Sequence, residues 1–298
     1  MKINICIPVF NEEENLPSFI KSLDSYLSKF DNKNFELNVV FYNDGSSDNS
    51  LEILKKTEYE VISELNNKGL GKAISMLFEY SIQDNVDGVI KLDCDGQMDI
   101  NEIDHYLQKI EKEPFDLLQG NRFEKSNNFK LSFFKKLGII FFRLIFRFLG
   151  MKIKDSSNGF IYVSKKWLED FKVIGHYNAA QQILLDTKLR GLNYSEVNVT
   201  IENRKSGKSF VGIRYPFNVI SSMIGLIVYR RTNKILTIPG IVTLLAALFL
   251  LINDVFLWMR QIEEKIISNQ ITVLMFIIGT QLLSLGLVTE FLKKQKII

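Results

Sequence analysis

Short apolar runs alternate with helix-like patterns along the first third of the chain. Four runs have the length and composition of buried strands, at 3–10, 37–42, 61–64 and 89–92. Helical patterns beginning near Asp, Asn or Gly cover 13–30, 48–56, 71–82 and 100–112. Strands separated by helices predict an α/β fold, with a mostly parallel sheet covered by helices on both faces. Ligands of such sheets lie outside the carboxyl ends of the strands.

Two long apolar stretches follow Lys234, at 235–252 and 271–289, and each is about long enough to cross a bilayer. Neither has the polar face that a helix in a soluble core normally shows, so a transmembrane hairpin is favoured over two buried helices. We expect its helices at about 235–258 and 271–290. Basic residues flank both ends of the hairpin, and the positive-inside rule therefore places the N-terminal domain in the cytoplasm.

The segment at about 130–150 is crowded with Phe, Ile and Leu, and its Lys136, Arg143 and Arg147 share one helical face. We expect an interfacial helix that turns these cations toward lipid phosphates. An ordinary amphipathic core helix is the alternative. The segment 210–234 is similar and predicts a juxtamembrane amphipathic helix.

Composition narrows the function classes. The 298 residues allow one large domain, or a medium domain with an appendage, and a net charge of +3 gives no reason to expect a nucleic-acid partner. Cys6 and Cys94 form no disulfide framework or thiolate metal site, which fits a reducing compartment. The N-terminal apolar run meets acidic residues at 12–14, too soon for a signal peptide, so we expect the domain to stay where it is made.

The strongest chemical signal follows the strand predicted at 89–92. Asp93 and Asp95, one residue apart and followed by a glycine turn, can offer oxygen ligands to a hard divalent cation that also holds phosphate. Surface turns also contain such pairs, so the context decides. Polar loops follow two other predicted strands, at 10–13 and 42–50, and the segment 66–72 offers backbone amides and lysines that suit phosphate.

Five motifs together resemble the family 2 glycosyltransferases in order and spacing. They are Ile7-Pro8-Val9-Phe10-Asn11-Glu12, Asn43-Asp44-Gly45-Ser46-Ser47-Asp48, Asn67-Lys68-Gly69-Leu70-Gly71-Lys72-Ala73, Asp93-Cys94-Asp95-Gly96-Gln97 and Gly120-Asn121-Arg122. The resemblance covers about three-quarters of the chain. Within the family, the chain looks most like the polyprenyl-phosphate glycosyltransferases, the group of dolichol-phosphate mannose synthase and the bacterial undecaprenyl-phosphate sugar transferases.

The resemblance implies a GT-A domain at 1–209, the juxtamembrane helix at 210–234 and the hairpin at 235–298. It implies an inverting transfer, with Mg²⁺ or Mn²⁺, from a UDP- or GDP-sugar to a polyprenyl phosphate, for cell-envelope glycan or glycoconjugate synthesis. The protein would be integral to the cytoplasmic membrane, or to the ER membrane of a eukaryote, with its catalytic domain on the cytosolic side. Self-association is left open.

The resemblance also implies roles for individual residues. The nucleotide sugar would be held by Pro8, Asn11, Glu12, Asp44, Lys72 and Asp93; the metal by Asp93 and Asp95; the acceptor phosphate by Arg204, Lys208 and Ser209; and Asp95, Gln97 and Arg122 would be catalytic. The segments 155–160 and 204–209 resemble the family's Asp-x-x-x-Gly-Phe motif and its Arg-x-x-Gly-x-Ser loop at the acceptor phosphate.

The chain departs from the family where an acidic residue usually precedes the segment found here at 191–197. It has Ala180-Gln181-Gln182 there. A hydroxyl acceptor needs a general base, whereas a lipid phosphate is already ionised, so this loss favours a phosphate acceptor. Arg204 and Lys208 could hold that anion.

Two other hypotheses stay open. An enzyme that extends a lipid-linked or surface glycan at a hydroxyl would need a base, for which Asp186 is a substitute. A non-catalytic membrane scaffold would keep the fold to bind a partner. His176 could contact donor or acceptor, but a capping or packing role is favoured for it.

Overall fold

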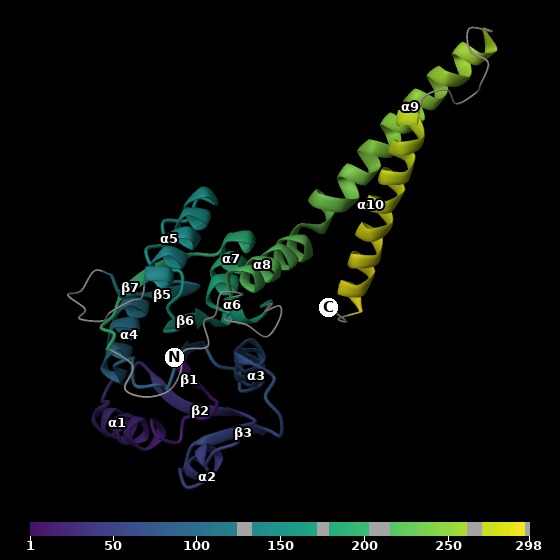
Figure 1. The fold of residues 1–298 in the computed structure, drawn as a ribbon. Coiled ribbons are helices and arrows are strands. Elements are labelled where there is room, and N and C mark those ends of the chain that lie inside the picture. The colour runs from purple at the N-terminus through teal and green to yellow at the C-terminus, as the bar shows by residue number, and fades with distance from the viewer. Residues whose placement is uncertain (124–132, 172–178, 203–214, 261–269, 296–298) are drawn as a thin grey trace. The chain divides into compact units, whose positions relative to one another are not determined.

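The computed structural model describes residues 1–123, 133–171, 179–202, 215–260 and 270–295. The chain divides into two compact units, Met1–Met223 and Ile224–Ile298. Figure 1 labels the helices and strands of both units.

A seven-stranded sheet with the order β3-β2-β1-β4-β6-β5-β7 forms the centre of the first unit. Its strands are β1 (Lys2–Val9), β2 (Glu36–Asp44), β3 (Glu60–Glu64), β4 (Gly88–Lys91), β5 (Leu117–Asn121), β6 (Ile161–Ser164) and β7 (Tyr194–Asn198). Neighbouring strands pair in parallel except at β6, which is antiparallel to β4 and β5. The carboxyl ends of the six parallel strands therefore meet at one edge of the sheet.

Helices cover both faces of this sheet (Figure 1). The helices of the first unit are α1 (Leu16–Lys29), α2 (Ser50–Leu54), α3 (Leu70–Gln83), the short 3-10 helix η1 (Ile100–Glu102), α4 (Ile103–Lys112), α5 (Phe133–Phe148), α6 (Lys165–Leu168) and α7 (Ala180–Arg190). Helix α8 (Tyr215–Thr232) begins in the first unit and continues into the second.

The alternation of side chains along β1 explains how the two faces are covered. Ile3, Ile5 and Ile7 point into a buried core that also contains residues of α1 and α4. Asn4 and Cys6 point to the other face, where Asn4 Nδ2 donates to Ser81 Oγ of α3 at 3.2 Å. The strand is buried on both faces and therefore reads as a continuous apolar run.

The structure confirms the predicted fold class and the four predicted strands, with ends shifted by one or two residues. The strands β5, β6 and β7, which follow residue 112, were not predicted from the sequence. The antiparallel β6 is set by its pairing partners, a tertiary property.

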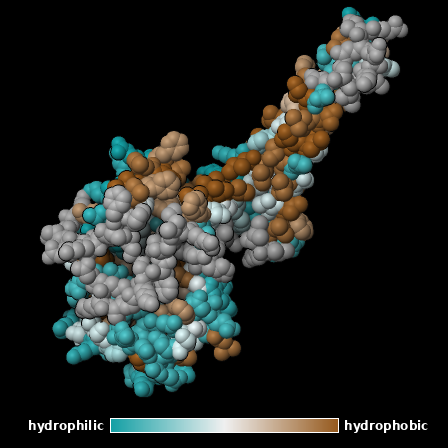
Figure 2. Space-filling view, in the orientation of Figure 1, coloured by the Kyte–Doolittle hydropathy of each residue, from teal (hydrophilic) through white to brown (hydrophobic). Residues whose placement is uncertain are grey.

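The second unit contains two long apolar helices, as predicted. After a π-helical turn, η2 (Asn233–Thr237), come α9 (Ile238–Met259) and α10 (Gln270–Lys294). Both are long and apolar enough to cross a membrane, yet only 11% and 17% of their most apolar windows are buried. Their hydrophobic side chains thus lie outside, where Figure 2 shows a mainly brown surface. This exposure disfavours the alternative of two helices buried in a soluble core.

Glycines bring α9 and α10 close together. A Cβ added to Gly240 would lie 2.7 Å from the backbone nitrogen of Leu283, and one added to Gly279 would lie 2.8 Å from Leu244 Cγ. Small residues at such crossings let helix backbones pack closely in a membrane. The buried Asp254 also accepts a hydrogen bond from Thr272 Oγ1 at 3.1 Å, which joins the two helices.

Replacing Gly240 by Ala is expected to loosen this helix pair. The new methyl group would meet backbone atoms of α10, which cannot rotate away, and overpacking of this kind costs about 1–3 kcal/mol. Thermal unfolding of the purified chain in detergent should show a lower melting temperature. Gly138→Ala is the control, because an added Cβ there meets nothing within 4 Å. Equal melting temperatures for the two variants would contradict the packing described here.

Candidate functional site

Three polar loops meet at the carboxyl edge of the parallel strands. Asn11, just after β1, has a positive φ of 54° and reaches the loop that follows β2. Its Oδ1 accepts from the backbone N of Ser47 at 2.8 Å, and its own backbone N donates to Ser46 Oγ at 3.0 Å. Beside it, the backbone N of Glu12 donates to Ser50 Oγ at 2.8 Å. The loops after β1 and β2 are therefore fastened together.

Asp44 fastens the loop that precedes α3. Its two carboxylate oxygens accept from the backbone nitrogens of Lys68 and Gly69, both at 2.8 Å, and the residue is 3% exposed. The sequence suggested that these amides suit phosphate, but they bond Asp44 instead. The next turn begins α3 and carries the half-buried Lys72. The predicted contact of Asp44 with the nucleoside stays a prediction.

Asp93 lies directly after β4 and is enclosed from several sides. Lys91 Nζ lies 2.5 Å from Asp93 Oδ1, and the backbone N of Asp93 donates to Met98 Sδ at 3.3 Å. On the other side, a Cβ added to Gly159 would lie 2.6 Å from Asp93 Oδ2. The segment 155–160, predicted to belong to the site, is thus brought against Asp93.

Cys94 lies among several carboxylates of this edge. Its Sγ lies 3.7 Å from the carbonyl oxygen of Pro8 in β1. Burial raises the pKa of the Cys94 thiol well above its ordinary value, and the carboxylates of Glu12, Asp93 and Asp95 raise it further. Four of the predicted site residues surround it.

Asp95 and Gln97 form the turn that follows. The backbone N of Gln97 donates to Asp95 Oδ1 at 3.1 Å, and Gln97 Nε2 donates to the carbonyl of Glu202 at 3.3 Å. Met98 also pairs with Ile201 in an isolated β-bridge. Glu202 is the last described residue before the predicted acceptor segment. Arg204, Lys208, Ser209 and His176 themselves lie outside the described residues.

Arg122, after β5, forms a bidentate ion pair with Asp155. Its Nε lies 2.5 Å from Asp155 Oδ2 and its Nη2 lies 3.0 Å from Asp155 Oδ1, while Nη2 also donates to Ser157 Oγ at 3.0 Å. Asp155 is fully buried. If Arg122 also contacts a phosphate, as predicted, its guanidinium would have to bind Asp155 and the phosphate at the same time.

Asp186 lies in α7, away from this edge. Its Oδ2 is 3.4 Å from Nη1 of Arg190, and the same Nη1 donates to the carbonyl of Trp167 at 2.7 Å. Trp167 follows β6, whose last residue, Ser164, pairs with Gly88 at the beginning of β4. Gly88 is at the beginning of β4, and Asp93 lies beyond its other end. Asp186 is fully buried, and its role as a base stays a prediction.

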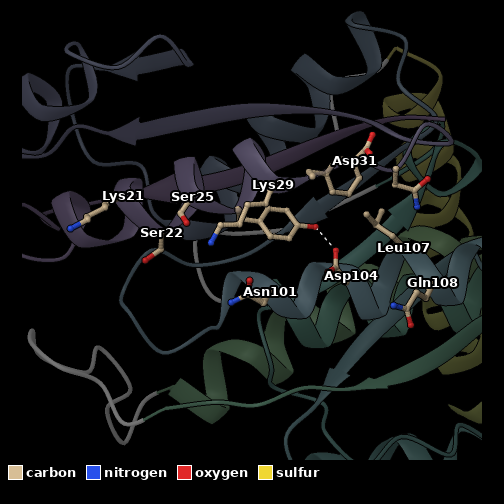
Figure 3. A pocket seen from close by; sticks show the side chains of 12 residues that line it. Lys21, Ser22, Ser25, Lys29, Asp31, Asn101, Asp104, Leu107 and Gln108 are labelled. Carbon is tan, nitrogen blue, oxygen red and sulfur yellow. Dashed lines mark hydrogen bonds between the residues drawn. The ribbon is translucent and has the colours of Figure 1, made fainter.

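One cavity of about 660 Å³ lies away from the predicted site, between α1 and α4 (Figure 3). It is lined by Lys21, Lys29, Asn101, Asp104 and neighbouring residues, and Tyr26 Oη donates to Asp104 Oδ1 at 2.7 Å within it. None of the residues predicted from the motifs lines this cavity. The cavity therefore gives no reason to place donor binding away from the predicted site.

Neither the position of Lys91 beside Asp93 nor the partner of Arg122 was predicted from the sequence. One signal was available, because a lysine inside an apolar strand is almost never fully buried unless it is paired. The pairing of Arg122 with Asp155, 33 residues away, depends on the tertiary fold.

Asp93 and Asp95 fit a divalent metal only if a bound substrate supplies further oxygen ligands. Among the described residues, no group of three or more His, Cys, Asp or Glu could hold a metal ion. Mg²⁺ typically binds one or two carboxylates together with substrate phosphates, rather than an all-protein cage. The half-buried Asp95, with hard oxygen donors at the edge of the sheet, fits a metal that is shared with a diphosphate.

The fold and the clustered motifs define a GT-A-type glycosyltransferase, and residues 4–172 match glycosyl transferase family 2. The chain belongs to that family. A bactoprenol glucosyl transferase of Shigella phage SfV is 29% identical over 181 residues, which cover 60% of this chain and 57% of the relative. The UDP-N-acetylglucosamine–dolichyl-phosphate N-acetylglucosaminyltransferase of Methanococcus voltae is 26% identical over 219 residues, which cover 66% of this chain and 84% of the relative.

Solved structures share the fold. Glucosyl-3-phosphoglycerate synthase from Mycobacterium tuberculosis, in complex with Mn²⁺ and UDP-glucose, superposes with a TM-score of 0.59 at 15% identity. The match covers 76% of this chain and 78% of that chain. The GT-A fold expected from the motifs is therefore confirmed.

Arg122→Met is expected to destabilise the protein strongly. Loss of the guanidinium would leave the buried Asp155 without its cation, which costs about 3–5 kcal/mol. Thermal unfolding in detergent measures the loss, and Arg122→Lys should lose less because it keeps the charge. Lys166→Met is the matched control, since Lys166 is 67% exposed where it meets Asp116 and such pairs contribute about 0–1 kcal/mol. Similar losses for Arg122→Met and Lys166→Met would refute a structural role for the Arg122–Asp155 pair.

Proposed function

We propose that this protein is a membrane-bound, metal-dependent, inverting glycosyltransferase that moves a sugar from a UDP- or GDP-sugar to a polyprenyl phosphate. The product would be a lipid-phosphate-linked sugar. Family membership and the printed activities of the phage and Methanococcus voltae relatives support the class of reaction. The chain spans 57% of the length of the phage relative, so the acceptor has to be argued from this chain's own residues.

The position of Asp186 is the observation that carries the choice of acceptor. A hydroxyl acceptor needs a carboxylate or another base near the reacting centre. The start of α7 has Gln181 and Gln182, and the fully buried Asp186 lies 3.4 Å from Nη1 of Arg190. A phosphate acceptor is already ionised at neutral pH, so its attack on the sugar needs no such base.

The donor would bind where the loops after β1, β2 and β4 meet. Pro8, Asn11, Glu12 and Asp44 belong to the interlocked loops, and Lys72 opens α3 beside them. The leaving diphosphate would lie over Asp93 and Asp95, together with Mg²⁺ or Mn²⁺. When bound, the metal supplies positive charge that stabilises the leaving diphosphate. Manganese and UDP-glucose in the related fold of the Mycobacterium tuberculosis enzyme support this assignment.

The acceptor would approach from the side of Gln97 and Glu202. The hydrogen bond between these two residues ties the turn after Asp95 to the segment that follows β7. Arg204, Lys208 and Ser209 would hold the lipid phosphate by charge-assisted hydrogen bonds. Gln97 would then lie between the donor and the acceptor and orient both for in-line attack.

The exposed apolar surface of α5 supports the proposal that a bilayer lies beside the catalytic domain. Ile139, Phe142 and Phe146 are buried, whereas a second apolar stripe is exposed at Leu137, Ile140, Phe141, Leu144 and Phe148. A helix that lies in the headgroup region would cover this stripe with acyl chains, and Lys136 and Arg147 flank it. Arg143 was predicted to face lipid phosphates, but its guanidinium donates to the carbonyl of Lys154 instead. The exposed apolar stripe of α5 places the catalytic domain beside a membrane, and the basic residues on both sides of the hairpin favour its cytosolic side.

The reaction is tested by incubating membranes that contain the protein with labelled UDP- or GDP-sugars and undecaprenyl or dolichyl phosphate. Metal-dependent transfer of label into organic solvent is the expected result. Asp95→Asn should lower the rate at least about a hundredfold, because stabilisation of the leaving group is lost. Label that enters only a polysaccharide would reject the phosphate acceptor.

Asp186→Asn separates the two acceptor classes. We expect the variant to transfer sugar to the lipid phosphate at a rate near that of wild type, provided that the protein folds to the same melting temperature. A folded Asp186→Asn protein without activity would identify this carboxylate as the base and favour the glycan-extending alternative. Normal cell phenotype with Asp95→Asn would instead favour a non-catalytic scaffold.

A further inference from the structure

A second pocket lies where β5 and β7 end, beside the C-terminal end of α5. Its volume is about 550 Å³, and its walls include Asn121, Lys152, Lys154, Tyr194, Glu196 and Asn198. β7 is the last strand of the sheet, and three strand spacings, about 14 Å, separate it from β4. No described residue of the proposed donor site lines this pocket. It is therefore a separate feature of the catalytic domain.

The segment between α5 and β6 brings two lysines to the pocket. Along this segment buried and exposed side chains alternate, because Met151 and Ile153 are buried whereas Lys152 and Lys154 are exposed and line the pocket. The apolar side chains anchor the segment in the domain. The two ammonium groups are thus left on the side of the pocket.

Hydrogen bonds fix the backbone of this segment from both sides. The backbone N of Lys152 donates to Tyr194 Oη at 3.2 Å, and that of Lys154 donates to Glu196 Oε1 at 2.8 Å. From α5, Arg143 Nε donates to the carbonyl of Lys154 at 2.9 Å. The lysines therefore extend from a backbone that is held between α5 and β7, so their positions are set before a ligand arrives.

The charge of the pocket favours an anion. A third cation is near, since a Cβ added to Gly150 would lie 3.4 Å from Lys188 Nζ. Of the described residues that line the pocket, Glu196 alone carries a carboxylate, and its Oε1 already accepts from the backbone nitrogens of Lys154 and Asp155. Burial raises the pKa of Glu196, so its negative charge is less favoured than that of an exposed carboxylate.

The position of the pocket relative to α5 indicates which anion it meets. Arg143, Arg147 and Gly150 follow one line along α5 and its end, at the spacing i, i+4 and i+7. This line runs beside the exposed apolar stripe, which includes Ile140 and Leu144. An interfacial helix sinks its apolar face to the boundary between headgroups and acyl chains. The line of cations and the pocket at its end then come to the level of the lipid headgroups.

We propose that this pocket binds the headgroup of an anionic membrane phospholipid. The lipid phosphate would accept charge-assisted hydrogen bonds from Lys152 and Lys154, with the exposed amide of Asn198 beside it. The acyl chains would run along the apolar stripe of α5. This inference goes beyond the proposed reaction, because the lipid would be neither consumed nor produced, and it rests on the placement of α5 at a bilayer. Occupancy would hold the catalytic domain against the membrane surface.

The test measures binding of dihexanoylphosphatidylglycerol, a soluble anionic lipid, to the full chain in neutral detergent by isothermal titration calorimetry. Dihexanoylphosphatidylcholine, which has a phosphate but no net charge, should bind at least about fivefold more weakly. Lys152→Gln/Lys154→Gln should weaken binding of the anionic lipid by about 25-fold, because each lysine near an anionic lipid contributes about fivefold. Lys55→Gln/Lys56→Gln is the matched control, since it also removes two adjacent exposed lysines, and should leave the affinity unchanged.

Asn198→Asp supplies a second variant that keeps both lysines. It retains the Oδ1 atom that accepts from Asn121 Nδ2 at 3.1 Å, and it adds a negative charge to the wall of the pocket. Binding of dihexanoylphosphatidylglycerol should weaken by about fivefold, with the melting temperature as a check that the variant folds. This comparison decides the matter even if the lysine variant does not fold.

Several results would overturn the headgroup site. They are a wild-type protein that does not bind the anionic lipid, equal affinity for the two lipids, and unchanged affinity in folded lysine or Asn198→Asp variants. Inorganic phosphate that binds as tightly as the anionic lipid would assign the pocket to a free anion. Undecaprenyl phosphate that displaces the lipid would make the pocket part of the acceptor site. None of these measurements requires sugar transfer, so failure of this inference is distinguishable from failure of the proposed function.

Discussion

The parallel pairing of β1, β2 and β4 is the constraint on which the site depends. Parallel strands deliver the loops that follow them to the same edge of the sheet, so motifs from distant parts of the sequence must meet there. Hydrogen bonds then fix the loops against one another, through Asn11 to Ser47 and through Asp44 to the amides before α3. The polar residues of the edge are therefore organised before any ligand is present.

Charge is balanced within this edge by two ion pairs that the protein supplies. Arg122 neutralises the buried Asp155, and Lys91 neutralises part of the acidic cluster around Cys94. Gly159 lies in the segment that follows Asp155, and a Cβ added to it would lie 2.6 Å from Asp93 Oδ2 and 2.8 Å from Lys91 Nζ, so a short stretch of backbone runs from one pair to the other. A diphosphate and its cation would enter a site where these two ion pairs are already formed.

The sequence was sufficient to predict the fold class, the strands of the first half, the apolar helix pair and the family, because these depend on local pattern and on motif spacing. It was not sufficient for β6, whose four residues are defined by pairing with β4 and β5. It also left Asp186 open as a base, since only the fold brings Arg190 to the carbonyl of Trp167. Contacts between residues far apart in the chain, such as that of Arg190 with Trp167, cannot be predicted from local pattern.

The central claim is that the loops after β1, β2 and β4 form one nucleotide-sugar site at the edge of the sheet. A structure of the full chain determined with Mn²⁺ and UDP or GDP tests it most directly. The account predicts the diphosphate over the Asp93–Gln97 turn, the metal in contact with Asp95 and the nucleoside against the loops of Asn11 and Asp44. Nucleotide bound instead in the cavity between α1 and α4, or metal bound away from Asp95, would contradict it.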